Sequence, residues 1–89
     1  MLNPLDQEGQ QFIENLLSRM TLAEKIGQMT QPEKNSVKPG DVARLSLGSV
    51  LSGGGGNPEP NTPQTWRAMV TAFIEESQQS RLSIPLIYG

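Results

Sequence analysis

The sequence predicts an α/β fold in which one helix connects two short parallel strands. Residues 48–51 and 84–88 are apolar without alternating polar residues, which is typical of parallel strands covered on both faces. The residues between them carry a helical repeat of apolar side chains, and residues 48–88 have about the length of a βαβ unit. A chain of 89 residues with 35% apolar residues buries too little surface to complete such a sheet. We therefore expect the chain to be part of a larger α/β structure.

Two helices are predicted ahead of the first strand. Asp6 is in position to cap the first helix, and Thr21 and Glu24 have the spacing of a capping box that starts the second. The apolar residues of the first helix repeat with a period of 3.6: Phe12, Ile13, Leu16, Leu17 and Met20. Those of the second helix are Leu22, Ile26 and Met29.

The connections are marked by proline, glycine and polar residues. Residues 30–40 are polar with two prolines and predict a surface connection, followed by one helical turn over residues 41–45. After the first strand come four glycines and then residues 57–61, which the prolines keep extended. Thr62 caps the third helix, with Pro63 at its first position, and Pro85 lies near the start of the second strand. The apolar residues of the third helix are Trp66, Met69, Val70, Phe73 and Ile74.

Composition excludes several classes of function. The absence of His and Cys excludes a Ser-His-Asp or Cys-His nucleophile and a thiolate or imidazole metal site. A pI of 4.9 and seven scattered cations argue against nucleic-acid binding. Apolar runs are far shorter than the roughly 20 residues of a membrane span, and residues 1–6 do not have the pattern of a signal peptide. We expect no cofactor and no metal.

The glycine run is the feature with possible chemistry. It lacks the Gly-Lys-Ser/Thr of a phosphate-binding loop and the spacing of a dinucleotide fingerprint. Two interpretations remain open: a flexible loop, or a ligand-lining loop at the carboxyl edge of a sheet.

Other candidate side chains favour structural roles. Trp66 and Phe73 lie on the apolar side of the third helix, which favours core packing over a sugar or base platform. Glu33 and Glu59 lie in loops and are not expected to be catalytic carboxylates. Two further acids, Glu75 and Glu76, fall outside the apolar face and predict a solvated surface, whereas the role of Tyr88 is open.

Three segments resemble, in order and separation, the N-terminal part of glycoside hydrolase family 3. Residues 19–30, RMTLAEKIGQMT, are similar to the N-terminal helix motif of that family. Residues 48–55, GSVLSGGG, resemble its first barrel strand and loop, and residues 81–89, RLSIPLIYG, resemble its second strand. The nearest members are exo-acting β-glucosidases and plant-type β-glucan exohydrolases.

The resemblance implies the N-terminal segment of a (β/α)8 TIM-type barrel, helices plus the first two strands, and not a complete domain. Residues 1–89 would form the first quarter of the barrel domain, with residues 1–47 as N-terminal helices and connection and residues 48–89 as the first βαβ unit. The implied activity is retaining hydrolysis that removes glucose from the non-reducing end of β-glucosides or β-glucans. Such enzymes use two carboxyl groups about 5–5.5 Å apart.

Neither carboxyl group of that pair maps onto this chain, so we expect no catalytic residue in it and no activity of the fragment alone. The family's glycine loop borders the glucose subsite, which makes Gly53 and Gly54 the candidate substrate-binding residues, because glycine allows close backbone approach. The implied partners are a β-glucoside or gluco-oligosaccharide substrate and the remainder of the same enzyme. A periplasmic or secreted location rests on the family resemblance alone.

A second hypothesis is a freestanding binding or regulatory module that reuses the βαβ unit without catalysis. An exposed sheet edge that recruits a partner strand would suit such a module. The complete reading frame distinguishes the two, because continuation through the rest of a barrel favours the enzyme and a natural stop codon favours the module.

Overall fold

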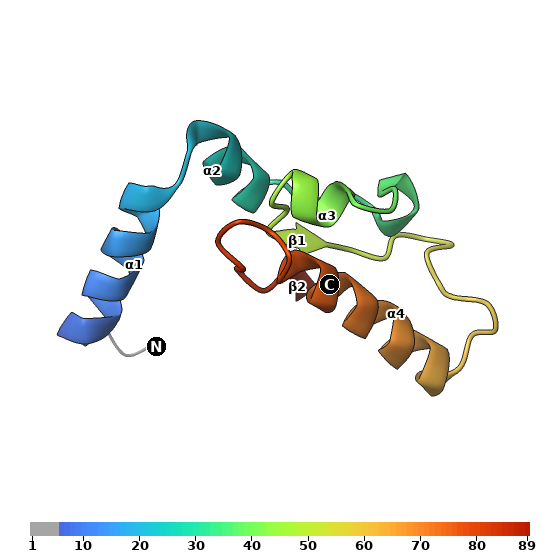
Figure 1. Cartoon of the computed structure of the whole chain (residues 1–89). Helices are drawn as coiled ribbons and strands as arrows, with labels where there is room; N and C mark the ends of the chain where they lie inside the picture. The colour runs from blue at the N-terminus through green and yellow to red at the C-terminus, as the bar shows by residue number, and fades with distance from the viewer. Residues whose placement is uncertain (1–5) are drawn as a thin grey trace.

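A computed structural model describes residues 6–89 and consists of helices around two short parallel strands (Figure 1). The expectation that residues 1–6 hold no signal peptide falls almost entirely outside the described residues. In chain order the elements are α1 (Gln7–Arg19), α2 (Leu22–Gln28), the 3-10 turn η1 (Lys34–Ser36), α3 (Asp41–Arg44), β1 (Ser49–Val50), α4 (Pro63–Ser77) and β2 (Ile87–Tyr88).

The helix starts form where the capping residues predict them. The Asp6 carboxylate accepts a hydrogen bond from the Gly9 N–H at 2.7 Å. Thr21 and Glu24 form the reciprocal capping box of α2, and Thr62 caps α4 with Pro63 in its first turn. These predictions are confirmed because a cap is decided by residues three or four positions apart.

The sheet is parallel, but its strands are shorter than predicted. Ser49 lies opposite Ile87 and Val50 opposite Tyr88, instead of pairing over residues 48–51 and 84–88. The start of the second predicted strand is lost because Pro85 has no N–H and the Leu86 N–H donates to the Ser77 hydroxyl at 3.0 Å. At the other edge of β1, Leu51 bonds the backbone of residues 32–34, so this predicted surface connection also lies alongside the sheet.

The core lies between the strands, α3 and α4. Its buried members are Val42, Leu47, Val50 and Leu86, with Val37, Phe73 and Tyr88 packed against them. The apolar pattern predicts strands covered on both faces, and residues 6–89 do not supply that cover for β2, where Ile87 is 71% exposed. The outer face of β2 therefore has no cover from residues 6–89.

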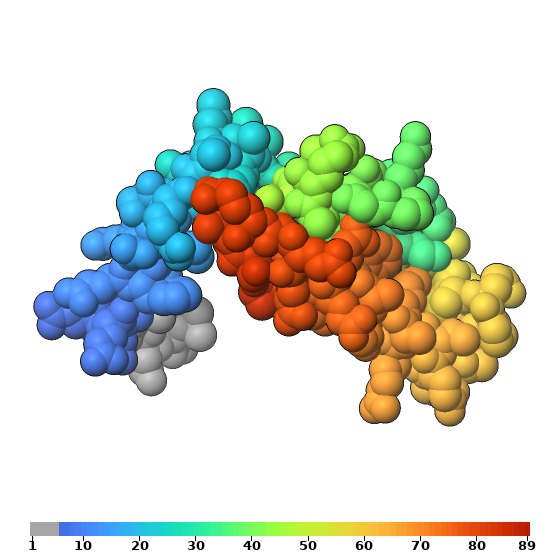
Figure 2. Space-filling model, in the orientation of Figure 1, coloured from blue at the N-terminus to red at the C-terminus, as the bar shows by residue number. Residues whose placement is uncertain are grey.

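Helix α1 extends away from this core (Figures 1 and 2). It contains no buried residue, and apolar side chains on α1 and α2 that the sequence places on one face of each helix are exposed: Phe12, Ile13, Leu17, Leu22, Ile26 and Met29. The radius of gyration is 14.8 Å, against about 12 Å for a compact chain of this length. Exposed apolar side chains that share one face of a helix indicate a face that packs against other protein.

Within residues 6–89, no helix is both long enough and apolar enough to cross a membrane.

Candidate functional site: the glycine loop at the carboxyl ends of the strands

The carboxyl ends of β1 and β2 lie side by side, and the glycine loop, residues 52–56, follows β1. The Gly89 N–H donates to the Val50 carbonyl, and the Ser52 N–H donates to the Gly89 carbonyl, each at 2.9 Å. The Ser52 and Tyr88 hydroxyls lie 2.5 Å apart, and the Tyr88 ring stands against Phe73 with a centroid separation of 5.8 Å. Tyr88, whose role the sequence leaves open, thus ties the end of β2 to the first residue of the loop.

The four glycines form a tight turn. The Gly56 N–H donates to the Gly53 carbonyl at 2.9 Å, and Gly55, the third residue of this turn, has a φ of 86°. A positive φ at the third position is the requirement of a type II turn and favours glycine. The residue of this turn that needs a left-handed conformation is therefore Gly55 and not Gly54.

The side chain of Glu33 lies against this turn. Its Oε1 accepts from the Gly53 N–H at 3.3 Å, and its Oε2 accepts from the Asn35 N–H at 2.5 Å. A Cβ on Gly53 would lie 3.1 Å from Glu33 Cγ, and a Cβ on Gly56 would lie 2.8 Å from Glu33 Oε1. Gly53, predicted to allow close approach of a substrate, is approached by the chain's own carboxylate.

Gly54 is the exposed apex of the turn. A Cβ there would meet nothing within 4 Å, unlike at Gly53. Within residues 6–89 no hydrogen bond engages the N–H groups of Gly54 and Gly55. These two backbone donors belong to exposed residues at the carboxyl edge of the sheet and are therefore available to an acceptor oxygen of a ligand.

Some aromatic residues and acids of α4 lie where the sequence predicts them, and others do not. Phe73 packs on the core as predicted, and half-buried Trp66 donates its Nε1–H to the Asn61 side chain at 2.6 Å. Glu75 is exposed, but the prediction of a solvated Glu76 is wrong, because its Oε1 is buried without a hydrogen-bond partner among the described residues. Residues 34–39 fold over that part of α4, which the helical period alone does not show.

Among residues 6–89, no three acids cluster as metal ligands.

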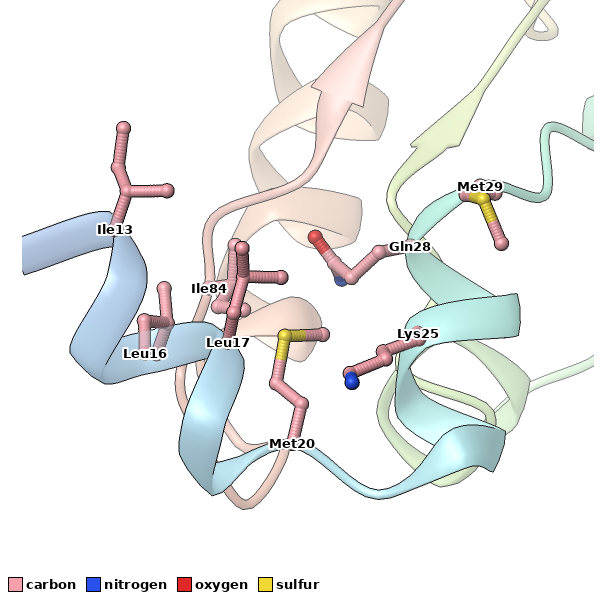
Figure 3. A pocket seen from close by; sticks show the side chains of 8 residues that line it. All are labelled: Ile13, Leu16, Leu17, Met20, Lys25, Gln28, Met29 and Ile84. Atoms are coloured by element: carbon pink, nitrogen blue, oxygen red, sulfur yellow. The ribbon is translucent and has the colours of Figure 1, made fainter. Parts of the chain in front are cut away.

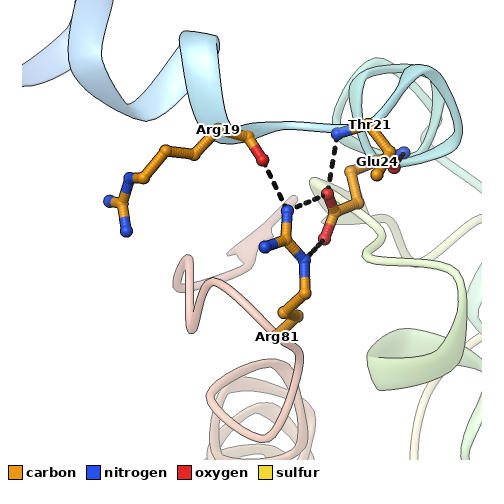
Figure 4. Close-up of polar contacts among 4 residues, drawn as sticks. All are labelled: Arg19, Thr21, Glu24 and Arg81. Atoms are coloured by element: carbon orange, nitrogen blue, oxygen red, sulfur yellow. Dashed lines mark hydrogen bonds and ion pairs between the residues drawn. The ribbon is translucent and has the colours of Figure 1, made fainter.

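A second polar cluster lies near the amino ends of the strands (Figure 4). Arg81 donates to both carboxylate oxygens of Glu24, at 2.6 and 2.9 Å, and to the Arg19 carbonyl at 2.6 Å. The same carboxylate accepts from the Thr21 N–H at 2.8 Å. The hydrogen bonds from Arg81 and then Thr21 lower the pKa of Glu24 to about 2. Sequence reasoning missed this pair, although Glu24 and Arg81 belong to two of the three quoted motifs.

A hollow of about 380 Å³ separates α1 from α2 and Ile84 (Figure 3). Its walls are mainly apolar, and Leu17, Met20 and Ile84 are among the side chains that line it. Of its polar side chains, Gln28 already donates to the Ser46 carbonyl at 2.8 Å. The hollow therefore lacks the convergent polar groups of a sugar site and resembles a gap between packed elements.

Comparison with solved structures identifies larger proteins that contain this arrangement. An exo-1,3/1,4-β-glucanase (ExoP) from a Pseudoalteromonas species is similar with a TM-score of 0.81 and 26% identity, over 98% of this chain and 12% of that chain. A mutant of the same enzyme gives a TM-score of 0.81 and 27% identity, over 94% of this chain and 14% of that chain. Both neighbours are glycoside hydrolases.

The chain therefore matches a segment of a larger glucanase and spans 12–14% of the length of the solved structures it matches. No family model matches the sequence, and no curated protein matches it at a significant level.

Proposed function

We propose that this chain is the N-terminal part of the (β/α)8 barrel of a family 3 glycoside hydrolase. The observation that carries the proposal is the likeness to the exo-β-glucanase over nearly the whole chain, at a TM-score of 0.81 and 26–27% identity. The parallel β1–α4–β2 unit and the uncovered apolar faces of α1, α2 and β2 support it, because a barrel would continue the sheet and cover those faces. In this proposal residues 1–47 supply the N-terminal helices and residues 48–89 the first βαβ unit.

The activity proposed for the complete enzyme is retaining removal of glucose from the non-reducing end of β-glucosides or β-glucans. We expect no catalytic carboxylate pair in this chain, and two of its acids already have other partners, since Glu33 accepts from the Gly53 N–H and Glu24 is paired with Arg81. The catalytic pair is therefore supplied by the remainder of the enzyme, and this chain supplies the loop beside the substrate.

The test uses the complete polypeptide that contains residues 1–89. It is assayed with an aryl β-glucoside and with β-1,3- and β-1,4-linked glucans, and the anomer first released is identified by proton NMR. Release of β-glucose one unit at a time supports the proposal, and the 89-residue chain alone should give no turnover above buffer. A natural stop codon after residue 89, or a complete polypeptide that binds glucans without hydrolysing them, would support the binding-module alternative, which the comparisons do not favour.

Gly53 and Gly54 are proposed to lie beside the glucose ring. The support is the exposed apex at Gly54 and the position of the turn at the carboxyl ends of parallel strands, where ligand sites of such sheets form. Gly54→Val in the complete enzyme should lower kcat/KM for β-glucosides at least about tenfold, because its side chain would occupy space that the sugar needs. Glu75→Gln on the exposed side of α4 is the control. A folded Gly54→Val enzyme with unchanged kcat/KM would contradict this role.

A further inference from the structure

The glycine turn and the 3-10 turn η1 are held together although they are about 20 residues apart in the chain. The backbone of Leu51 bonds Pro32 O and Lys34 N, at 3.1 and 2.8 Å. Two side-chain hydrogen bonds add to this backbone bridge. Glu33 accepts from the Gly53 N–H, and the Asn35 amide donates to the Gly55 carbonyl at 3.4 Å. The first and third residues of the turn are thus attached to residues 33–35.

Glu33 is the central member of these contacts. One carboxylate oxygen accepts a hydrogen bond from the Gly53 N–H, and the other accepts one from the Asn35 N–H. A single side chain therefore fixes the glycine turn and η1 relative to each other. The space for that carboxylate exists because Gly53 and Gly56 have no side chains. Replacing the carboxylate removes the only side-chain acceptor of the Gly53 N–H within the described residues.

We infer that Glu33 is a positioning residue for a sugar subsite: it holds the glycine turn so that the Gly54 and Gly55 N–H groups face the ligand. This inference rests on the proposed function. The ligand class is a sugar ring, whose hydroxyl oxygens accept hydrogen bonds from backbone N–H groups. Glu33 itself faces the opposite side of the turn, against Gly53 and Gly56, and is not a catalytic residue.

The first test is kinetic and uses the complete enzyme with an aryl β-glucoside. Glu33→Ala should raise KM at least about fivefold while kcat stays within about twofold, because the subsite is displaced and the catalytic carboxylates are not. Glu33→Gln keeps the size of the side chain and one acceptor oxygen, so its KM should rise less, by about two- to threefold. The matched control is Glu59→Ala, which removes an exposed loop acid without a hydrogen bond in the described chain.

The second test measures hydrogen exchange of the peptide covering residues 52–56 in the same variants by mass spectrometry. Glu33→Ala should accelerate exchange at least about tenfold, and Glu59→Ala should not. If Glu33→Ala does not fold, Glu33→Gln decides, with an intermediate acceleration expected.

The outcomes separate this inference from the proposed function. Unchanged hydrogen exchange of residues 52–56 in the Glu33 variants would contradict the inference that Glu33 holds the glycine turn. Faster exchange with an unchanged KM would contradict the inference that this turn positions a sugar subsite. An inactive complete wild-type polypeptide overturns the proposed function and the sugar subsite together, whereas the exchange result still decides whether Glu33 holds the turn.

Discussion

Gly27 is the position where a single methyl group should test the packing of α2 against the chain leading into β1. It is buried, and a Cβ added there would lie 2.0 Å from the Leu45 carbonyl oxygen and 2.8 Å from the Ser46 carbonyl oxygen. Both atoms are backbone, so they cannot move aside as a flexible side chain would. Gly27→Ala must therefore push α2 away from residues 45–48 by about 1 Å or more.

That displacement breaks named contacts. The Gly48 N–H donates to the Gly27 carbonyl at 2.9 Å, and the Gln28 amide donates to the Ser46 carbonyl at 2.8 Å. Two lost hydrogen bonds cost about 2 kcal/mol, and overpacking adds about 1–3 kcal/mol. The higher helix propensity of alanine relative to glycine offsets about 1 kcal/mol of this loss. The net destabilisation is about 2–4 kcal/mol, so the steric effect outweighs the propensity.

The assay is thermal unfolding of the complete polypeptide, followed by circular dichroism. A loss of that size lowers Tm by about 3–5 °C, taking about 1.3 °C per kcal/mol for a barrel domain of about 350 residues, four times the length of this chain. The matched control is Gly54→Ala, where the added methyl group meets nothing within 4 Å and the Tm should change by less than about 2 °C. A Gly27→Ala protein with the Tm of wild type would refute the close contact between α2 and residues 45–48.

Three further outcomes are expected. Glu24→Gln should lower Tm at pH 7, and the difference from wild type should shrink as the pH falls from about 4.5 toward 2. The reason is that the pKa of Glu24 is lowered to about 2 by Arg81 and Thr21, so the stabilisation is present above the ordinary pKa of 4.5 and is lost as the carboxylate is protonated; a Tm difference independent of pH would contradict it. Ser77→Ala should cost about 1–3 kcal/mol in urea unfolding of the complete polypeptide, since it leaves the buried Leu86 N–H without an acceptor, and an unchanged midpoint would exclude that contact. The 89-residue chain alone should bind an apolar dye and melt without a cooperative transition, and a sharp transition in dilute buffer would count against the uncovered faces.

Local features of the fold can be predicted because neighbouring residues decide them. The caps at Asp6, Thr21 and Thr62 each depend on a partner three positions away, so their residue types suffice. Strand length is overestimated from the sequence because the partner of the Leu86 N–H is a side chain on α4, nine residues earlier. The apolar faces of α1 and α2 are identified correctly, and residues 6–89 leave them uncovered, as expected of a chain too short to bury all its apolar surface.

The position of the glycine loop can be predicted from the sequence, but its contacts with other parts of the chain cannot. An apolar strand followed by glycines correctly indicates a loop at the carboxyl end of the sheet. The residues leave open a flexible or a ligand-lining loop, and they do not show that Gly53 and Gly56 make room for Glu33, which residue type alone marks as an ordinary loop acid. The missing information is the bridge between Glu33 and Leu51, a contact across 18 residues that the hydrophobic pattern does not encode.

The two ends of the short sheet are fastened by different carboxylates, and this separates stability from recognition. Near the amino ends, Glu24 and Arg81 join the α1–α2 connection to the turn before β2, far along the chain from the glycine loop. At the carboxyl ends, Glu33 holds the turn whose apex carries the two unengaged N–H groups. In the proposed enzyme, loss of the Arg81 pair should therefore lower Tm with little change in KM, whereas loss of Glu33 should raise KM. If both substitutions changed KM equally, the glycine loop would owe its position to the packing of the whole segment and not to the carboxylate beneath it.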